Sequence, residues 1–150
     1  MRRADVVVLL FDLTETLSEV DKKLAATILA EHKPCILVGN KLDLAREAGV
    51  DVGAYEAYVR QQLVGLSFAP LAFVSAKDGT NVAPTLAVCR ELFEQGGVTI
   101  GTPELNRVLQ AAQAKNAPSK GGKLPKMFYG TQIRSRPPTV LLFVNDPTMF

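Results

Sequence analysis

The chain has 150 residues, of which 47% are hydrophobic and 21% charged, and this composition is typical of a globular protein rather than a disordered one. No apolar run approaches the roughly 18 residues that a membrane-spanning helix needs, and the first residues do not resemble a secretion signal. The net charge of +2 is divided unevenly, with −3 over residues 1–95 and +5 over residues 96–150. The basic second part favours a polyanionic partner.

The first part of the chain alternates between two kinds of pattern. Short, continuously apolar and β-branched runs predict buried strands at residues 5–13, 34–40 and 71–76. Apolar residues at helical spacing follow each run, at residues 20–32, 52–63 and 82–93. This βαβαβα order predicts a parallel sheet with helices on its faces.

Two details refine the predicted helices. Ser18 lies three residues before Asp21, a spacing typical of a capping box at a helix start. The third helix has one apolar stripe, formed by Val82, Leu86, Cys89 and Phe93.

The two cysteines, Cys35 and Cys89, both lie inside apolar segments. We expect two buried free thiols in a reducing compartment. A disulfide or a metal site has no support, because the cysteines and the single His32 lack any ligand spacing.

A glycine-rich stretch at residues 94–104 interrupts the alternating pattern. We therefore expect a first domain at residues 1–95, a linker at 96–101 and a second domain at 102–150. Thr102 and Pro103 are suited to the N-cap and the first residue of a helix.

The second part has a different pattern from the first. After the helix that begins near Thr102 comes a basic loop at residues 115–125, followed by predicted strands at 126–132 and 139–145. The order is α-β-β, and Asn145 or Asp146 before a proline is typical of the cap of a further helix.

Asn40, Lys41 and Asp43 directly follow the second predicted strand, in the sequence Asn-Lys-Leu-Asp. Open α/β sheets bind ligands at the carboxyl ends of their parallel strands. A carboxylate can accept hydrogen bonds from both the N1–H and the N2 amine of guanine, and adenine offers no such pair. We expect Asp43 to select guanine, Asn40 to contact N7 and brace the neighbouring loops, and the Lys41 stem to lie along the purine.

Ser75, Ala76 and Lys77 follow the third predicted strand. Here the Ala76 N–H can donate to guanine O6, Ser75 can fix the loop, and the Lys77 stem can cover the other purine face. Such a polar pocket rejects the wrong base because mismatched groups stay unpaired. The alternative is that Asn40 and Asp43 only cap the next segment and that Lys77 is a solvated surface lysine.

These 150 residues contain no phosphate-binding loop of the Gly-x-x-x-x-Gly-Lys-Ser/Thr type. The nearest string, residues 117–124, has Ala117 at the first glycine position and Leu124 at the hydroxyl position, and it does not join a strand to a helix. We interpret it as a basic loop. No Asp-x-x-Gly element precedes the first strand either.

Asn40-Lys41-Leu42-Asp43 and Ser75-Ala76-Lys77 resemble the guanine-specificity motifs of translation-factor-class GTPases. Residues 102–110 and 118–150, above all "RPPTVLLFVNDP", resemble the C-terminal KH-like domain of the Der, or EngA, family of bacterial ribosome-assembly proteins, which have two consecutive GTPase domains. The Era family is less similar, because its KH domain uses a Gly-x-x-Gly loop that residues 119–123 do not supply.

The resemblance implies an α/β fold: a partial P-loop-GTPase-type, Rossmann-like parallel sheet, followed by an α+β KH-like domain. Residues 1–95 would be the rear half of the second GTPase domain, and the KH-like domain would be truncated before its last helix and strand. On this interpretation the chain is a fragment. GTP or GDP would be the ligand, and Mg²⁺ would bind only with the missing phosphate-binding half.

The same resemblance implies a cytoplasmic protein that contacts the large ribosomal subunit or its rRNA, with no membrane or DNA partner. Asp43 and its neighbours would supply base selectivity only, because the groups that catalyse phosphoryl transfer belong to the missing parts. We assign no catalytic residue to this chain, and we expect the isolated chain to hydrolyse no GTP above background.

Three hypotheses for function stay open. The chain acts in large-subunit assembly as part of a GTPase and supplies guanine recognition and an rRNA-docking module; or it is a non-catalytic RNA-binding or scaffold remnant without nucleotide turnover; or it has no role. The candidate phosphate contacts are Lys115, Lys120, Lys123, Lys126, Arg134 and Arg136. The alternative for these side chains is an ordinary solvated loop face.

Overall fold

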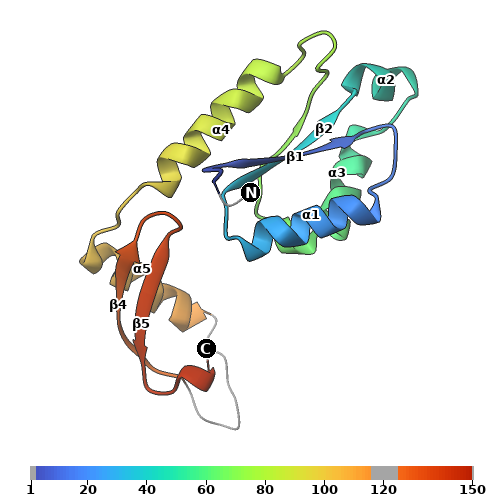
Figure 1. Cartoon of the computed structure of the whole chain (residues 1–150). Coiled ribbons are helices and arrows are strands. Elements are labelled where there is room, and N and C mark those ends of the chain that lie inside the picture. Colours follow the sequence, from blue (N-terminus) through green and yellow to red (C-terminus); the bar gives the residue numbers. More distant parts are fainter. Residues whose placement is uncertain (1–2, 116–124, 150) are drawn as a thin grey trace. The chain divides into compact units, whose positions relative to one another are not determined.

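A computed structural model describes residues 3–115 and 125–149 of the chain (Figure 1). The chain divides into two compact units, Met1–Gln95 and Gly96–Phe150, which we call unit 1 and unit 2 and describe separately. None of the helices in the described ranges combines the length and the apolar character that crossing a membrane requires.

Unit 1 is built on a parallel sheet with the strand order β1-β2-β3. The strands are β1 (Val7–Asp12), β2 (Cys35–Asn40) and β3 (Leu71–Phe73). The register pairs Asp12 with Asn40 and Gly39 with Phe73, so the carboxyl ends of all three strands lie at one edge. The predicted parallel sheet is confirmed.

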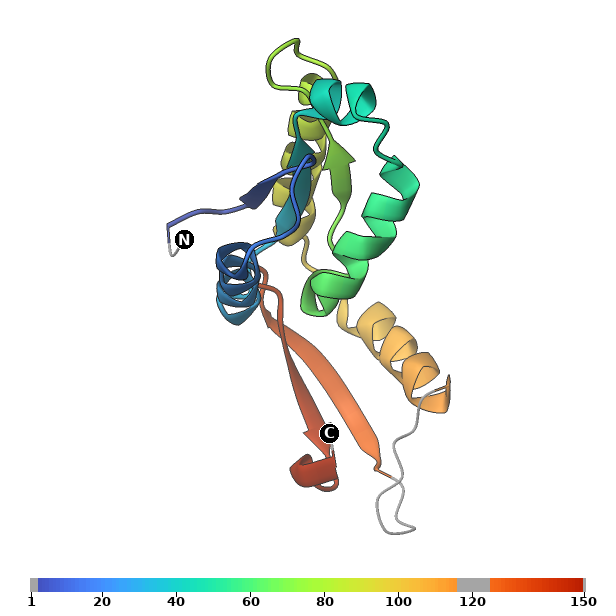
Figure 2. The same ribbon diagram turned by 90° about the vertical axis from the view of Figure 1, so that its right-hand side faces the viewer.

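The helices of unit 1 cover both faces of this sheet (Figures 1 and 2). They are α1 (Glu19–Ala30), α2 (Leu42–Glu47), α3 (Val52–Gln62), the 3₁₀ helix η1 (Val64–Leu66) and α4 (Val82–Gly96). On one face, Ile28 of α1 and Val59 of α3 pack with Leu9 and Leu37 of the strands. On the other face, α4 packs against Ile36 and Val38 of β2.

The start of α1 follows the predicted pattern. The Ser18 side chain accepts a hydrogen bond from the Asp21 N–H at 3.2 Å, and the Asp21 carboxylate accepts one from the Ser18 N–H at 2.8 Å. This reciprocal pairing satisfies two backbone donors that a helix start otherwise leaves free. The capping box predicted from the sequence is confirmed.

The predicted apolar stripe of α4 is wrong in part. Leu86 and Phe93 are exposed, at 62% and 39%. The sheet is contacted instead by Val88, Cys89 and Leu92, together with Val82. Apolar residues on α4 span more than one helical face, and the spacing alone could not show which of these faces the sheet would cover.

Unit 2 contains one helix and one antiparallel strand pair among its described residues. These elements are α5 (Thr102–Lys115), β4 (Met127–Arg134) and β5 (Thr139–Val144), followed by the short 3₁₀ helix η2 (Pro147–Met149). The predicted α-β-β order is confirmed. Thr102 is the first helical residue rather than the cap, because the Leu105 N–H donates to the Gly101 carbonyl.

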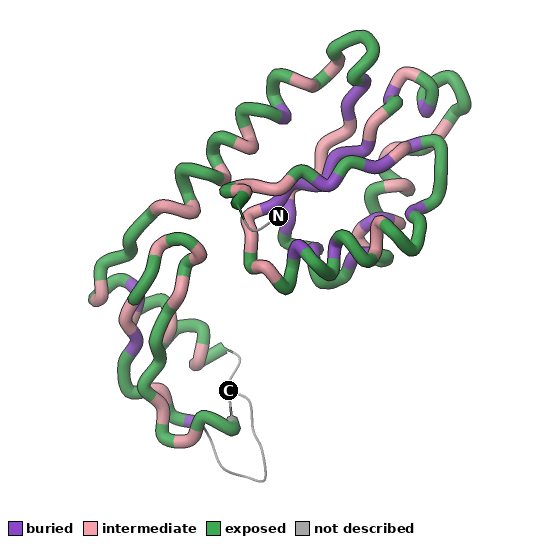
Figure 3. The backbone as a smooth tube through the Cα atoms, in the orientation of Figure 1, coloured by how far each residue is buried: buried purple, intermediate pink, exposed green. Residues whose placement is uncertain are grey.

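Side-chain amides hold unit 2 together where apolar burial is sparse (Figure 3). The Asn106 amide of α5 both donates to the Gly130 carbonyl and accepts from the Gly130 N–H, each at 2.8 Å. Gln132 accepts from the Ile100 N–H at 2.7 Å and donates to the Val98 carbonyl at 3.1 Å. Each amide thus pairs with backbone groups as a neighbouring strand would.

The two thiols differ in burial. Cys35 is 1% exposed at the start of β2, whereas Cys89 on α4 is only half-buried. The expectation of two buried thiols is therefore correct for Cys35 alone. Burial raises the pKa of the Cys35 thiol, which lowers the fraction of the reactive thiolate.

This difference predicts the order in which the thiols react. In the native protein at pH 8, an alkylating reagent should modify Cys89 at least about tenfold faster than Cys35, because the latter reacts only when unit 1 opens. Mass spectrometry of Cys35→Ser and Cys89→Ser variants, each with one thiol, measures the two rates. Equal rates in the two native proteins would contradict the described burial, whereas in denaturant the two rates should become similar.

Candidate guanine-recognition site

Two loops 36 residues apart in sequence meet at the carboxyl edge of the sheet. The side-chain oxygen of Asn40 accepts a hydrogen bond from the Ala76 N–H at 3.0 Å. Backbone bonds continue the strand pairing into the loops: Val74 N–H donates to the Gly39 carbonyl at 2.8 Å, and Leu42 N–H donates to the Val74 carbonyl at 2.9 Å. The polar residues that follow β2 and β3 are thus held side by side.

Asp43 lies in the first turn of α2, and one of its oxygens is fixed by the other loop. The Ser75 hydroxyl, which is 1% exposed, donates to Asp43 Oδ1 at 2.9 Å. The second oxygen, Oδ2, lies 3.9 Å from the Lys77 ammonium. The Asp43 side chain is only 16% exposed, so its carboxylate is held in one orientation at the edge of a pocket.

Lys41 has a backbone conformation that is uncommon for a residue with a side chain. It precedes α2 with φ 66° and ψ 39°, in the left-handed region. This region costs roughly 1–2 kcal/mol for a residue other than glycine. Its ammonium lies 2.5 Å from Asp12 Oδ2, at the end of β1.

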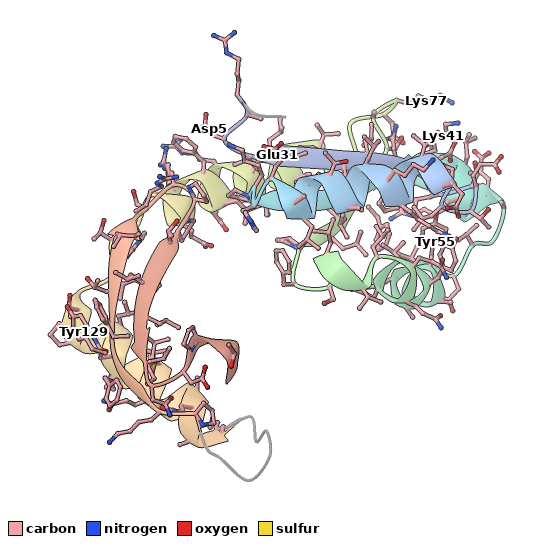
Figure 4. All side chains as sticks on the ribbon, turned by 60° about the horizontal axis from the view of Figure 1, so that its bottom comes forward. Asp5, Glu31, Lys41, Tyr55, Lys77 and Tyr129 are labelled. Atoms are coloured by element: carbon pink, nitrogen blue, oxygen red, sulfur yellow. The ribbon has the colours of Figure 1, made fainter. Side chains whose placement is uncertain are left out.

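The two lysines of the predicted site lie at the same end of unit 1 (Figure 4). Both line a pocket of about 300 Å³, whose other lining residues are Asn40, Asp43 and Leu44. That volume is at the lower end of the range for small-molecule sites, which suits a base better than a whole nucleotide. The Lys77 side chain is 82% exposed, so its stem is free to move over the pocket.

Asp12 also belongs to this group of polar side chains, although it is not among the residues predicted from the sequence. Its carboxylate accepts from the Lys41 ammonium and from both the N–H and the hydroxyl of Thr14. The hydrogen bond with Lys41 is the main reason why the pKa of Asp12 is lowered to about 2. The same contact raises the pKa of Lys41. The signal in the sequence was the position of Asp12 at the carboxyl end of a strand next to β2.

The six predicted guanine-site residues thus lie at one edge of the sheet. One predicted contact, from the Ala76 N–H to the base, conflicts with a hydrogen bond in the structure. The sequence-based assignment gave the Ala76 N–H to guanine O6, whereas the structure gives this donor to Asn40. A ligand oxygen would have to share or replace that contact. Asn40 bonds to the neighbouring loop in the way that its bracing role requires.

The loop after β3 keeps its shape through bonds of its own. Ser75 N–H donates to the Thr80 carbonyl, and Gly79 N–H donates to the Ser75 carbonyl, with Gly79 at φ 83°. The Asn81 side chain donates to the Phe73 carbonyl at 2.9 Å. This small closed loop fixes where Ser75 and Ala76 point.

The predicted RNA-contact residues belong to unit 2. Lys115, Lys126, Arg134 and Arg136 are exposed. Lys120 and Lys123 lie outside the described residues. The Lys126 ammonium lies 5.4 Å from the centre of the Phe128 ring, and the Arg136 guanidinium packs against Gly97. These two cations are therefore engaged within unit 2, while Arg134 is exposed at the end of β4.

Comparison with known proteins shows which family this sequence resembles. Residues 99–150 match the family described as KH-domain-like of EngA bacterial GTPase enzymes, C-terminal. The chain is 40% identical over 148 residues to the GTPase Der of Rhodopirellula baltica, which covers 98% of this chain and 32% of that protein. The chain is homologous to part of the Der, or EngA, family of GTPases.

Other members of the family show the same extent of similarity. The GTPase Der of Nostoc punctiforme is 38% identical over 152 residues, covering 100% of this chain and 33% of that protein. That of Natranaerobius thermophilus is 37% identical over 150 residues, covering 99% and 34%. The chain therefore spans about a third of the length of the Der relatives that it matches.

Metal binding has no support within the described ranges. No group of three or more His, Cys, Asp or Glu side chains there is arranged to hold a metal ion. We assign no ligand of Mg²⁺ among residues 3–115 and 125–149.

The hydrogen bond between Ser75 and Asp43 makes a stability prediction. Ser75→Ala should lower the free energy of unfolding of unit 1 by about 1 kcal/mol, because Asp43 Oδ1 loses a buried hydrogen-bond donor. Urea unfolding followed by circular dichroism measures the change, with the exposed Ser67→Ala as a matched control. An equal effect of the two substitutions would show that the Ser75 hydroxyl contributes nothing there.

Proposed function

We propose that unit 1 recognises the guanine end of GTP or GDP and that unit 2 docks on ribosomal RNA, as parts of a cytoplasmic protein that acts in assembly of the large ribosomal subunit. The observation that carries the first half is the Asp43 carboxylate, fixed by Ser75 at the edge of a base-sized pocket. The names of the Der relatives describe those proteins as GTPases, which supports the same ligand.

The chemistry of the pocket suits guanine better than the other bases. Guanine presents two adjacent N–H donors on its N1–N2 edge, and an ionised carboxylate with one oxygen already oriented by a hydroxyl is a matching acceptor. Adenine would place an N1 acceptor against the Asp43 carboxylate, and the two acceptors would repel each other. The selectivity thus comes from the unpaired groups that a wrong base would leave.

The remaining residues serve the flat faces and the far edge of the base. The alkyl stems of Lys41 and Lys77 both line the pocket, and such stems can cover a purine while the ammonium stays in water. We assign Asn40 and the Ala76 N–H, which are hydrogen-bonded to each other, to the edge of the base that carries N7 and O6. In this proposal guanine O6 shares the Ala76 N–H with Asn40 Oδ1. The phosphates and any Mg²⁺ are not assigned to residues of this chain, and neither is hydrolysis.

RNA docking by unit 2 rests on charge and on the KH-domain-like match. Residues 96–150 carry seven basic and two acidic side chains, and residues 99–150 match the KH-domain-like family of EngA. Arginine and lysine gain RNA affinity by displacing counterions from phosphates. The candidate contacts are Lys115, Lys126, Arg134 and Arg136, together with Lys120 and Lys123.

A second candidate function is RNA binding without nucleotide turnover. The +5 charge of residues 96–150 favours it independently of unit 1. The two candidates differ in whether guanine nucleotide changes RNA affinity. Filter binding with ribosomal RNA, with and without GDP, separates them.

The role of Asp43 predicts a change of base preference. Asp43→Asn should weaken GDP binding by about tenfold or more, because a charge-assisted acceptor is lost. It should bind xanthosine diphosphate better than the unsubstituted chain does, since the new amide can donate to the xanthine O2. Ligand-observed NMR at millimolar nucleotide measures both affinities.

Inosine diphosphate is the matched ligand control, because inosine lacks only the N2 amine. The unsubstituted chain should prefer GDP to inosine diphosphate, and Asp43→Asn should reduce this preference. Equal affinity of the unsubstituted chain for the guanine, inosine and adenine diphosphates would contradict base recognition.

The charge on unit 2 predicts a salt dependence. Arg134→Ala should reduce the slope of log affinity for single-stranded ribosomal RNA against log salt by roughly 0.7, the value for one lost phosphate contact. Fluorescence anisotropy at several salt concentrations measures the slope, with Lys33→Ala in unit 1 as the control. Equal slopes for both variants would remove Arg134 from the docking surface.

A further inference from the structure

Asp12 stands at the end of β1, beside the strand that leads into the candidate pocket. The parallel register pairs Asp12 with Asn40, and the Leu13 N–H donates to the Asn40 carbonyl at 2.9 Å. Side chains of directly paired residues lie on the same side of a sheet. From this position the Asp12 carboxylate reaches the residue after Asn40, which is Lys41.

We propose that Asp12 is a positioning residue for the base: its carboxylate holds the Lys41 ammonium, and so holds the Lys41 stem where it covers one face of the purine. The inference rests on the proposed function of the pocket. Three observations support it: the fixed carboxylate, the strained backbone of Lys41, and the attachment of the Asp12 loop to α3.

Contacts with Thr14 orient the Asp12 carboxylate toward Lys41. Its Oδ1 accepts from the Thr14 N–H at 2.9 Å and from the Thr14 hydroxyl at 2.7 Å, which leaves Oδ2 directed at the lysine. The Asp12 side chain is 27% exposed and the Lys41 side chain 49% exposed, so the pair is partly shielded from water. Such a contact restricts a long side chain that water alone would leave mobile.

The Lys41 backbone is held by its own contacts in a conformation that costs energy. Leu42 N–H donates to the Val74 carbonyl and Ala45 N–H donates to the Lys41 carbonyl, which together keep residue 41 at positive φ. Strained residues of this kind concentrate at ligand sites. With the backbone fixed on one side and the ammonium fixed on the other, the alkyl stem between them has few conformations left.

The loop that carries Asp12 is itself attached to helix α3. The Tyr55 hydroxyl donates to the carbonyl oxygens of Asp12 and Glu15, at 3.1 and 2.7 Å. The Tyr58 hydroxyl accepts from the Leu17 N–H at 3.0 Å. Burial is the largest cause that raises the pKa of Tyr55 to about 12, so this hydroxyl keeps its proton at neutral pH. The position of Asp12 thus depends on the core and not on the loop alone.

The test compares variants whose effects on base identity and base stacking differ. Asp12→Asn keeps the shape and removes the charge, and it should weaken binding of GDP and inosine diphosphate by the same factor, about three- to tenfold. Asp43→Asn should instead change the ratio of the two affinities. Asp5→Asn is the charge-matched control, because Asp5 is exposed before the opposite end of β1 (Figure 4).

A double-mutant cycle separates positioning from a general loss of structure. Lys41→Met keeps an alkyl stem and removes the ammonium, so adding Asp12→Asn to it should cause no further loss of GDP affinity. A further loss of the same size in the Lys41→Met background would overturn the proposal. Unchanged GDP affinity in Asp12→Asn alone would overturn it as well.

A readout without nucleotide separates this proposal from the function on which it rests. In the ligand-free protein, ¹³C relaxation of the Lys41 Cε should report a restricted side chain, and Asp12→Asn but not Asp5→Asn should make it mobile. If the unsubstituted chain binds no GDP, the proposed function fails and the base-positioning role fails with it. If the unsubstituted chain binds GDP and Lys41 is equally mobile in all three proteins, only the role of Asp12 is overturned.

Discussion

The hydrogen bond between the Ala76 N–H and the Asn40 side chain joins two loops that the sequence separates by 36 residues. It is possible only because β2 and β3 run parallel in a register that brings Gly39 beside Phe73. The other polar contacts between the loops after β2 and β3 follow from this alignment. Without it, Ser75 would not reach Asp43 and Lys77 would not lie over the same space.

The candidate site is therefore a product of sheet geometry more than of any single loop. Three strands end at one edge, and each leads to one polar residue of the candidate site, namely Asp12 at the end of β1, Asp43 after β2 and Ser75 after β3. Thr14, in the same loop, orients the Asp12 carboxylate, and Ser75, in the loop after β3, orients the Asp43 carboxylate, before any ligand arrives. Preorganised acceptors of this kind lose less entropy on binding.

Much of the fold could be predicted from the sequence because its patterns are local. Buried parallel strands are continuous apolar runs, and the capping box of α1 needs only residues 18–21. The packing face of α4 could not be predicted in the same way, since Leu86 and Phe93 satisfy the helical spacing as well as Val88 and Leu92 do. Which apolar face a sheet covers is decided by tertiary structure.

The residues of the candidate site also divide into those with a local signal in the sequence and those that only the tertiary structure reveals. Asn40, Asp43 and Ser75 stand out in the sequence because polar residues directly follow apolar strands. Asp12 also ends such a strand, but its partner Lys41 lies 29 positions later, and only the register between β1 and β2 shows that they meet. The partner of the Ala76 N–H was likewise unpredictable, because a backbone donor leaves no trace in the sequence.

Unit 2 depends on a different balance of forces. Its buried residues within the described ranges are Leu105, Pro125 and Gly130, and the amides of Asn106, Gln132 and Asn145 supply backbone-like pairing instead. A small core leaves more of the surface for charged side chains, and the net charge of +5 lies on this part of the chain. Residues 99–150, which include α5, β4 and β5, are the part of the chain that matches the KH-domain-like family of EngA.

An amide-resolved NMR titration can decide whether the loops after β2 and β3 hold a guanine base. On addition of GDP to the ¹⁵N-labelled chain, we expect saturable shifts at residues 40–44 and 75–77, and no comparable shifts with ADP. Shifts of the same size with both nucleotides, or shifts confined to other residues, would contradict it.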